Sequence, residues 1–250
     1  MTQLHRSIKQ TKPRIIAAIP CLNEGQFVRD IVTRTRRYVD KVIVVDDGST
    51  DNTSEAAQAA GAHVIRHERK KGAGAATRSA FAMAKTYDAD VLITLDGDGQ
   101  HDPDEIPQVL APILRGEADL VIGSRFLLKS YKKAPRYRKL GIDLITWLYN
   151  FGSKFRVSDS QSCFRAHTLR LVEAVDITEN GFSFSVQVLI QARQKGFLIK
   201  EVPVSCIYHS ESSSLNPMAH GLAVAWGVVK LRFRDELLTL RRRKKDELKE

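Results

Sequence analysis

Short apolar runs alternate along the first half of the chain with longer segments whose apolar residues recur at helical spacing. The runs are rich in Val, Ile and Leu, as strands buried on both faces of a sheet require. They lie at 14–19, 41–45, 63–66, 91–95 and 119–122. The intervening segments predict helices at 25–39, 49–60, 72–85 and 103–114, the second of them capped by Ser49 and Thr50. This alternation predicts an α/β fold with a mostly parallel sheet covered by helices on both faces.

The second half of the chain is less regular. We expect helices at 140–151 and 181–194, strand structure at 197–208, and a basic, aromatic loop at 127–139. The segment 217–250 begins apolar and ends in basic residues, which favours one or two helices. No long linker interrupts the chain. We therefore expect one domain at 14–215, between a polar tail at 1–13 and an amphipathic, basic helical segment at 216–250.

Composition narrows the class of protein. The chain has 250 residues, of which 43% are hydrophobic and 27% are charged, as in soluble globular domains. Its three cysteines, Cys21, Cys163 and Cys206, are isolated, which argues against a disulfide framework or zinc site and fits a reducing cytoplasm. The sequence contains neither the apolar segment of a signal peptide nor an apolar run long enough to cross a bilayer. Any contact with a membrane is therefore expected to be peripheral.

The chain is basic, with a formal net charge of +10. Such a charge favours polyanionic partners, which include nucleic acid, an anionic membrane and phosphate-bearing substrates. Charge by itself does not choose among these three.

Acidic residues stand at the end of the second predicted strand. Asp46 and Asp47 follow its apolar run directly. Ligands of open α/β sheets bind outside the carboxyl ends of the strands. A carboxylate there can accept hydrogen bonds from a nucleobase or from ribose hydroxyls, and Asp47 can shape the turn at the same time.

A second acidic pair follows the strand at 91–95. Asp96 and Asp98 are separated by Gly97 and followed by Gln100. Two crowded carboxylates repel one another unless a cation or a proton compensates, and hard oxygen ligands favour Mg²⁺ or Mn²⁺. Such an ion can bridge a diphosphate and stabilise its charge as it leaves. A calcium loop is disfavoured because its remaining ligands are missing, and a purely structural acidic turn is the alternative.

Two further segments suit a nucleotide site. Asn23 and Glu24 follow the first strand, and Lys71 and Gly72 open a run of small residues at 71–76. Small residues let a backbone approach a phosphate closely, and a lysine supplies positive charge. Each segment taken alone also fits an ordinary helix start.

Taken together and in order, these segments resemble family 2 glycosyltransferases, and within them the polyprenyl-phosphate (dolichyl-phosphate) mannose and glucose synthases. The matching segments are PCLNE at 20–24, VVDDGSTDNT at 44–53, KGAGAA at 71–76, LDGDGQHDPDEI at 95–106, GSR at 123–125, DSQSCFR at 159–165 and EVPV at 201–204. The resemblance covers about residues 14–215 and implies a GT-A fold, with a Rossmann-like sheet flanked by helices. Cys163 departs from the family, which often has Gly there.

The resemblance also implies roles for single residues. The donor would be a UDP- or GDP-linked hexose, contacted by Pro20, Leu22, Asn23, Glu24, Asp46, Asp47, Lys71, Gly72, Asp96 and Gly97. Asp96, Asp98 and Gln100 would hold Mg²⁺ or Mn²⁺. The catalytic group would comprise Asp98, Arg125 and Asp159, with Arg125 facing phosphate oxygens.

Asp159 bears on the identity of the acceptor. A hydroxyl acceptor needs a base, and Asp159 would supply it. A lipid phosphate is already anionic near neutral pH, in which case Asp159 would orient the loop or the metal. We expect inverting transfer to a polyprenyl phosphate, with a soluble or glycan hydroxyl acceptor as the alternative.

Basic and apolar segments adjoin each other in the second half. The basic residues of 129–139 precede a helix with Trp147, Tyr149 and Phe151, which favours a lipid phosphate seated at an anionic bilayer surface. The same helix also suits a core position. The apolar residues of 218–233 favour interfacial docking or a homodimer. We expect a cytoplasmic protein held peripherally at the inner face of the membrane.

Two other classes of protein are less consistent with the sequence. A nucleic-acid-binding protein would explain the charge, but no such motif is present and the acidic residues would line its cleft. A non-catalytic nucleotide-sugar binder is disfavoured because Asp96 and Asp98 are both intact.

Overall fold

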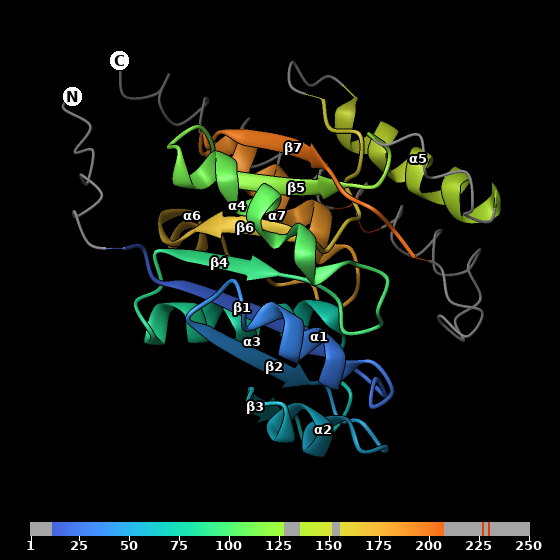
Figure 1. Cartoon of the computed structure of the whole chain (residues 1–250). Helices are drawn as coiled ribbons and strands as arrows, with labels where there is room; N and C mark the ends of the chain where they lie inside the picture. The colour runs from blue at the N-terminus through green and yellow to red at the C-terminus, as the bar shows by residue number, and fades with distance from the viewer. Residues whose placement is uncertain (1–11, 128–135, 152–155, 208–226, 228–229, 231–250) are drawn as a thin grey trace, which may run out of the picture.

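Seven strands of the computed structural model form one sheet in the order β3-β2-β1-β4-β6-β5-β7 (Figure 1). The structure describes residues 12–127, 136–151, 156–207, 227 and 230. The strands are β1 (Ile15–Cys21), β2 (Lys41–Asp46), β3 (His63–Arg66), β4 (Val91–Thr94), β5 (Leu120–Ser124), β6 (Arg165–Thr168) and β7 (Ile199–Pro203). Neighbouring strands run parallel except at β6, which is antiparallel to β4 and β5. The mostly parallel sheet predicted from the sequence is confirmed.

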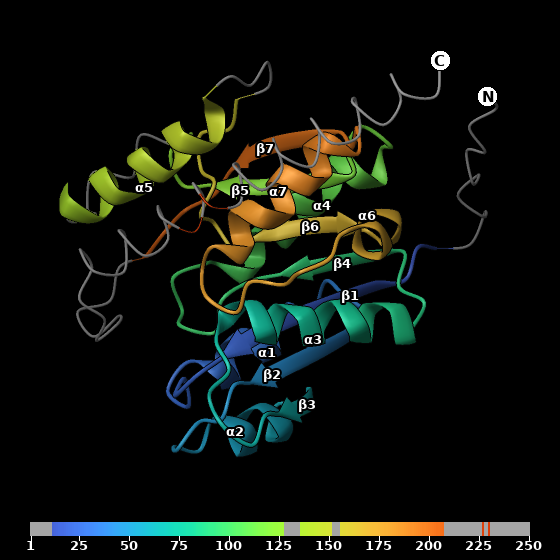
Figure 2. The ribbon, with the colours of Figure 1, turned by 180° about the vertical axis from the view of Figure 1, so that it is seen from behind.

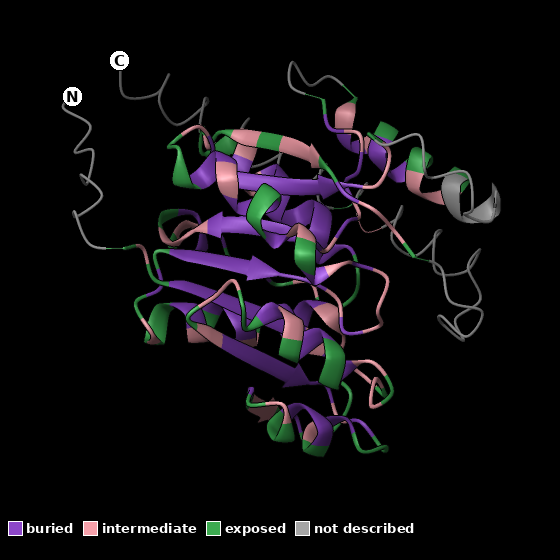
Figure 3. Cartoon of the chain, viewed as in Figure 1, coloured by how far each residue is buried: buried purple, intermediate pink, exposed green. Residues whose placement is uncertain are grey.

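Helices cover both faces of the sheet (Figure 2). They are α1 (Val28–Thr35), α2 (Thr53–Ala59), α3 (Ala73–Thr86), the 3₁₀ turn η1 (Pro103–Glu105), α4 (Ile106–Leu114), α5 (Arg136–Asn150), α6 (Leu169–Ala174) and α7 (Phe184–Gln194). Alternate residues of a strand point to opposite faces. Ile16 and Ala18 of β1 pack with residues of α3, α6 and α7, whereas Ile15 and Ala17 pack with residues of α1 and α4. The inner strands are buried along their length (Figure 3), as their continuous apolar runs predict.

The structure differs from the sequence-based expectation at three places. Helix α5 begins at Arg136, so the last four residues of the loop expected at 127–139 are helical. Helix α2 begins at Thr53 and has Asn52 at its N-cap position, so the predicted caps Ser49 and Thr50 are wrong. Ser49 Oγ instead accepts a hydrogen bond from Asn23 N at 2.9 Å. Strand β6 and the short helix α6 were not predicted. The four residues of β6 include Arg165 and His167, yet the strand is buried between two others.

Strands β1, β2 and β4 are neighbours in the sheet, so their carboxyl ends meet at one end of the molecule (Figure 1). Helix α5 lies at the same end, beyond the termini of β5 and β7. Among the described residues, no helix combines the length and the apolar character that a membrane span requires. The tail expected at 1–13 is described only from Lys12. The basic residues of 129–135 and the segment 216–250, apart from residues 227 and 230, lie outside the described residues.

Candidate active site

Acidic side chains collect at the carboxyl ends of three adjacent strands. Glu24 follows β1, Asp46 and Asp47 end and follow β2, and Asp96 and Asp98 follow β4. The strand order β2-β1-β4 places these three groups side by side. The sequence predicts acids at each strand end, and the sheet order brings them into one site.

The carboxylate of Asp47 organises the loop before α3. Its Oδ1 accepts a hydrogen bond from Lys71 N at 2.9 Å, and its Oδ2 accepts one from Gly72 N at 2.7 Å. Gly72 has a φ of +103°, a conformation that favours glycine. Asp47, Lys71 and Gly72, which the sequence analysis assigned to one site, therefore lie together.

Two residues missed by the sequence analysis support Asp47. His67 Nδ1 lies 2.7 Å from Asp47 Oδ1, and His67 Nε2 lies 3.0 Å from Ser79 Oγ. His67 and Asp47 are both buried. The only local signal for His67 is its place directly after β3, which runs parallel to β2.

Asp46 holds its own turn together. It is fully buried and accepts hydrogen bonds from Ser49 N at 2.8 Å and from the hydroxyl of Ser54. Burial acts to raise the pKa of Asp46, but the hydrogen bonds from Ser49 and Ser54 and the charge of Arg66 outweigh it, so the pKa is lowered. Asp46 is therefore ionised and committed to the turn, and its predicted contact with the donor stays a prediction.

The loop after β1 is tied to the loop after β2. Asn23 N donates to Ser49 Oγ at 2.9 Å, and Asn23 Oδ1 accepts from Thr50 N at 2.8 Å. Glu24 N donates to Thr53 Oγ1 at 2.8 Å. These hydrogen bonds fix the backbone of the predicted nucleotide loop. The carboxyl group of Glu24 lies near enough to Asp96 and Asp98 for their charges to raise its pKa.

Asp96 and Asp98 form an electrostatically crowded pair with Glu24. Burial and the charge of Asp98 raise the pKa of Asp96 to about 7. Burial and the charges of Asp98 and Asp96 raise the pKa of Glu24 to about 8. Asp98 accepts hydrogen bonds from Gln100, at 3.0 Å from its backbone N and 2.6 Å from its Nε2. The three predicted metal ligands, Asp96, Asp98 and Gln100, thus occupy one short loop.

This acidic loop fits a divalent cation that takes part of its ligands from a bound phosphate. A bound cation would relieve the electrostatic repulsion among the carboxylates of Glu24, Asp96 and Asp98. Within the described part of the chain, no three His, Cys, Asp or Glu side chains are arranged to hold a metal ion. Mg²⁺ commonly uses one or two protein carboxylates and completes its shell with water and substrate phosphates. The residues present suit that mode of binding.

His101 and Gly97 show how tightly the same loop is packed. His101 is buried, its Nε2 lies 3.7 Å from Asp96 Oδ2, and burial and the charge of Arg125 lower its pKa to about 3. His101 is therefore neutral. A side chain on Gly97 would place its Cβ 2.3 Å from the Sγ of Cys21, so glycine is required for this close approach.

Arg125 and Asp159 form a buried ion pair next to the acidic loop. Arg125 Nε and Nη2 donate to Asp159 at 2.7 and 2.9 Å, and Arg125 N donates to it at 3.3 Å. Gln161 N and Ser162 N donate to the same carboxylate at 3.2 and 3.0 Å. Burial acts to raise the pKa of Asp159, but the charge and hydrogen bonds of Arg125 outweigh it, so the pKa is lowered.

Glu201 supports this pair from β7. It accepts hydrogen bonds from Ser158 N at 2.8 Å and from Asp159 N at 3.0 Å. Glu201 belongs to the EVPV segment at 201–204, whose resemblance to the family implies no role for this residue. Its partners are 42 and 43 positions away in the chain, so no local pattern could have identified them.

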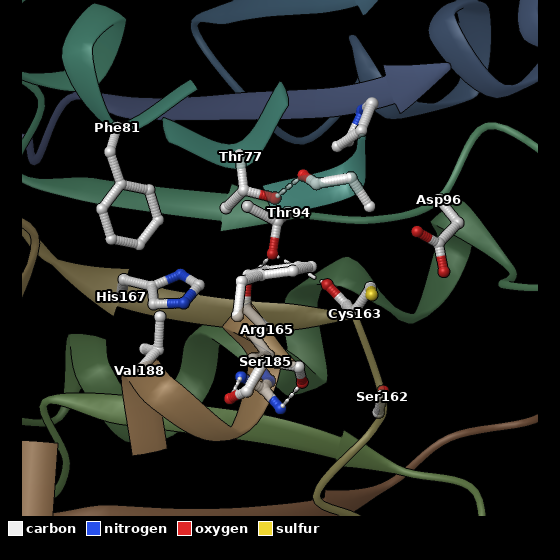
Figure 4. Close-up of a pocket in the computed structure, with 13 residues that line it drawn as sticks. Thr77, Phe81, Thr94, Asp96, Ser162, Cys163, Arg165, His167, Ser185 and Val188 are labelled. Atoms are coloured by element: carbon white, nitrogen blue, oxygen red, sulfur yellow. Dashed lines mark hydrogen bonds between the residues drawn. The ribbon is translucent and has the colours of Figure 1, made fainter. Parts of the chain in front are cut away.

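A small cavity of about 20 Å³ lies beneath the acidic loop (Figure 4). Asp96, Cys163 and Ser162 line it at one side, and Arg165 and His167 line it deeper in the fold. Arg165 is buried and donates to Ser160 O at 2.8 Å and to Ser185 O at 2.9 Å. A cavity of this size holds about one water molecule, and Cys163 lines it together with Asp96.

The remaining predicted residues lie at the same end of the sheet. Pro20 belongs to β1 and lines the cavity together with Asp96. Leu22 is half-buried in the loop between β1 and Asn23. The residues predicted for the donor, the metal and catalysis thus lie together at the carboxyl ends of β2, β1 and β4 and beside Arg125, which follows β5.

Comparison with known proteins gives a consistent result. Residues 16–174 match the model of the family described as glycosyl transferase family 2. A UDP-N-acetylglucosamine–dolichyl-phosphate N-acetylglucosaminyltransferase of Methanococcus voltae is 32% identical over 85% of this chain and 91% of its own length. An undecaprenyl-phosphate mannosyltransferase of Micrococcus luteus is 28% identical over 88% of this chain and 99% of its own length.

A solved structure shares the fold. Glucosyl-3-phosphoglycerate synthase from Mycobacterium tuberculosis, crystallised with Mn²⁺, uridine diphosphate and phosphoglyceric acid, superimposes with a TM-score of 0.71. The match covers 88% of this chain and 78% of that protein at 20% sequence identity. The arrangement of strands and helices is therefore that of a known nucleotide-sugar enzyme.

Proposed function

This chain belongs to glycosyl transferase family 2, and we propose that it transfers a hexose from a UDP- or GDP-sugar to a polyprenyl phosphate, with inversion at the anomeric carbon. Its two relatives described above are named for transfer to dolichyl phosphate and to undecaprenyl phosphate. The observation that supports a phosphate acceptor is that the carboxylate of Asp159 is buried and already accepts several hydrogen bonds.

The donor half of the reaction uses the surface along β2, β1 and β4. The loop held by Asp47 presents the backbone of Lys71 and Gly72, and the neighbouring loop after β1 presents Leu22 and Glu24. These groups suit the nucleoside and its ribose, with the diphosphate directed toward Asp96 and Asp98. In this position the sugar would lie near the Arg125–Asp159 pair.

A divalent cation would complete this half of the site. Asp96, Asp98 and Gln100 would hold Mg²⁺ or Mn²⁺, which supplies Lewis-acid stabilisation of the leaving diphosphate when bound. Gln100 donates to both oxygens of Asp98 and so fixes the orientation of that carboxylate. The crystallised neighbour contains Mn²⁺, and the acidic crowding in this chain supports the same requirement.

Asp159 favours a phosphate acceptor over a hydroxyl acceptor. Its carboxylate is fully buried and accepts hydrogen bonds from Arg125, Gln161 N and Ser162 N. A general base must reach the proton it removes with an available lone pair. A phosphate monoester carries negative charge near neutral pH and needs no such base. Asp159 is therefore assigned to orienting Arg125, and the acceptor oxygen attacks the anomeric carbon in line with the leaving diphosphate.

The outer face of α5 supports contact with a lipid surface. Leu140, Leu144, Trp147 and Phe151 recur at helical spacing and are 69%, 48%, 57% and 61% exposed. The opposite face buries Ile145 and Tyr149 in the core. The helix thus has a buried face and an exposed apolar face, which suits a core position on one side and contact with lipid on the other. An exposed apolar stripe of this kind, beside basic sequence at 129–139, is typical of helices that lie in a bilayer interface.

Transfer of labelled sugar tests the proposal directly. Labelled UDP- and GDP-sugars would be incubated with Mn²⁺ or Mg²⁺ and a polyprenyl phosphate, and the organic phase would be counted. We expect label in the organic phase that is lost with EDTA and with Asp98→Ala, but kept with Asp30→Ala, an exposed acid of α1. Metal-dependent donor binding without organic label would move the assignment to a hydroxyl acceptor.

A further inference from the structure

The backbone N–H groups of the segment that carries Asp159 are held by side chains from two different elements, α5 and β7. Val157 N donates to Asn150 Oδ1 at 2.9 Å, and Ser160 N donates to Thr146 Oγ1 at 3.3 Å. The two amide groups between them, those of Ser158 and Asp159, donate to Glu201 of β7. Four consecutive backbone N–H groups are thus satisfied by side chains, which replace the backbone ladder of regular structure.

Helix α5 contributes the outer two of these four contacts. Each contact has a second bond that strengthens it. Asn150 Nδ2 also donates to Val157 O at 2.8 Å, and the hydroxyls of Thr146 and Ser160 lie 2.9 Å apart. Thr146 is buried and lies one turn before Asn150, so both act from the inner side of the helix.

The contacts continue to the reaction centre. Asp159 lies between Val157 and Ser160, and its carboxylate holds the guanidinium of Arg125. A change in the position of α5 would therefore displace Val157 and Ser160, the residues on either side of Ser158 and Asp159. Glu201 fixes the same segment to β7, whose register with β5 also sets the position of Arg125. Among the described contacts of the 157–160 segment, those from α5 connect the pair to a helix with an exposed apolar face.

We propose that Thr146 and Asn150 are positioning residues that couple the lipid-facing helix α5 to the Arg125–Asp159 pair. This inference rests on the proposed transfer to a polyprenyl phosphate. Docking of α5 on a bilayer fixes the helix, and its inner side holds the 157–160 segment so that Arg125 meets the acceptor phosphate. The donor pocket along β1 and β2 does not depend on these bonds.

Substitutions at Thr146 test the coupling. Thr146→Val keeps the shape of the side chain and removes its oxygen, whereas Thr146→Ser keeps the oxygen. A matched control is Thr35→Val in α1, because Thr35 is also buried and its hydroxyl has no hydrogen-bond partner in the described structure. Asn150→Ala, which removes the other anchor, provides an independent second variant.

Three quantities would be measured for each protein: kcat with polyprenyl phosphate in anionic vesicles at saturating donor, Kd for the nucleoside diphosphate of the active donor, and the melting temperature. We expect Thr146→Val and Asn150→Ala to lower kcat about tenfold, because an orphaned buried N–H displaces the segment, with nucleotide Kd within about twofold of wild type. Thr146→Ser and Thr35→Val should retain wild-type kcat.

The possible outcomes separate the two proposals. Absence of lipid transfer by the wild-type protein contradicts the proposed function itself. Wild-type transfer with unchanged kcat in Thr146→Val and Asn150→Ala overturns only the coupling. So does a loss of nucleotide affinity that parallels the loss of kcat, since that result indicates general disruption of the fold.

Discussion

Arg125 and Asp159 meet through two nearly parallel hydrogen bonds, of 2.7 and 2.9 Å, although 34 residues separate them in the chain. The side chain of Arg125 is 11% exposed and that of Asp159 is fully buried. A bidentate ion pair of this kind fixes the plane of the guanidinium group as well as its position. Arg125 is therefore presented to the site in one orientation.

Asp159→Asn should lower both activity and stability. The change removes the negative charge that compensates the guanidinium of Arg125, and breaking a buried pair costs about 3–5 kcal/mol. We expect a clear fall in melting temperature together with a fall in kcat toward polyprenyl phosphate. Transfer assays and thermal melts would measure the two effects.

The pH profile distinguishes orientation from base catalysis in the same variant. If Asp159 only orients Arg125, the residual activity of Asp159→Asn keeps the acid limb of the wild-type profile. Disappearance of that limb in the variant would identify Asp159 as a base and contradict the assignment.

Asp98→Ala should remove the metal-dependent part of donor affinity. In the proposed function, Asp98 is one of two carboxylates that would share a cation with the diphosphate, and metal stabilisation of phosphate charge amounts to several kcal/mol. Calorimetric titration with UDP and GDP, with and without Mn²⁺, would measure it. We expect affinity in Mn²⁺ to fall at least about tenfold, with little change in its absence. Equal losses under both conditions would place Asp98 outside the metal site.

His67→Leu should weaken donor binding although His67 itself need not touch the donor. The change removes one partner of the buried Asp47 carboxylate, which holds Lys71 N and Gly72 N. Loss of such a partner costs about 1–3 kcal/mol. Ser79→Ala is the control with a smaller expected effect, because Ser79 contacts His67 Nε2 and not the nitrogen that faces Asp47. Nucleotide affinity in the order wild type, Ser79→Ala, His67→Leu is expected, and equal affinity in all three would contradict this role.

His167→Gln should make folding stability less sensitive to acid. His167 is buried, and burial together with the charge of Arg165 lowers its pKa to about 3. The unfolded chain binds a proton at about pH 6.5, whereas the folded chain does not. The contribution of neutral His167 to the free energy of unfolding is therefore fully present above that pH. This contribution is lost as the pH falls from about 6.5 toward 3, by up to about 1.4 kcal/mol per pH unit.

Urea unfolding at several pH values between 7 and 4.5 would measure the slope. We expect the free energy of unfolding of His167→Gln to fall less steeply than that of wild type. Parallel slopes in the two proteins would show that His167 is not the residue that titrates on unfolding.

Trp147→Glu and Leu144→Glu should reduce binding to anionic vesicles. Both side chains are exposed on α5, so a charge there removes an apolar contact with lipid while leaving the core intact. Each is expected to weaken binding by about 1–3 kcal/mol, as measured by co-sedimentation. Leu198→Glu is the matched control, since Leu198 is 59% exposed and lies just before β7, away from α5. An equal loss in the control would indicate a nonspecific charge effect.

The alternation of apolar runs and amphipathic segments was sufficient to predict most of the fold. Strands β1, β2, β4 and β5 are buried on both faces, and such strands carry their signal in local composition. Strand β6 carries no such signal, because Arg165 and His167 interrupt its apolar character. Its burial depends on hydrogen bonds and neighbours supplied by distant segments.

The residues of the candidate site also fall into those that local sequence predicts and those that depend on distant contacts. Acids and glycines directly after apolar strands could be predicted, because the end of a strand and the conformation of a turn are local properties. Asp47, Asp96, Gly97 and Asp98 belong to this group. The supporting residues His67, Glu201 and Thr146 could not be predicted, because each acts on a partner that only the folded chain brings near.

The class of fold, the strand ends that carry the candidate site and the acidic character of that site could be read from the amino-acid sequence, since these follow from local pattern and charge. Three features depend on the folded chain. Strands β2, β1 and β4 are neighbours in the sheet, and the carboxylate of Asp159 accepts its hydrogen bonds from Arg125 and from its own loop. Helix α5 has one buried and one exposed face. The physical reason is that hydrogen bonding and burial depend on contacts between residues far apart in the chain. Local propensity does not encode such contacts.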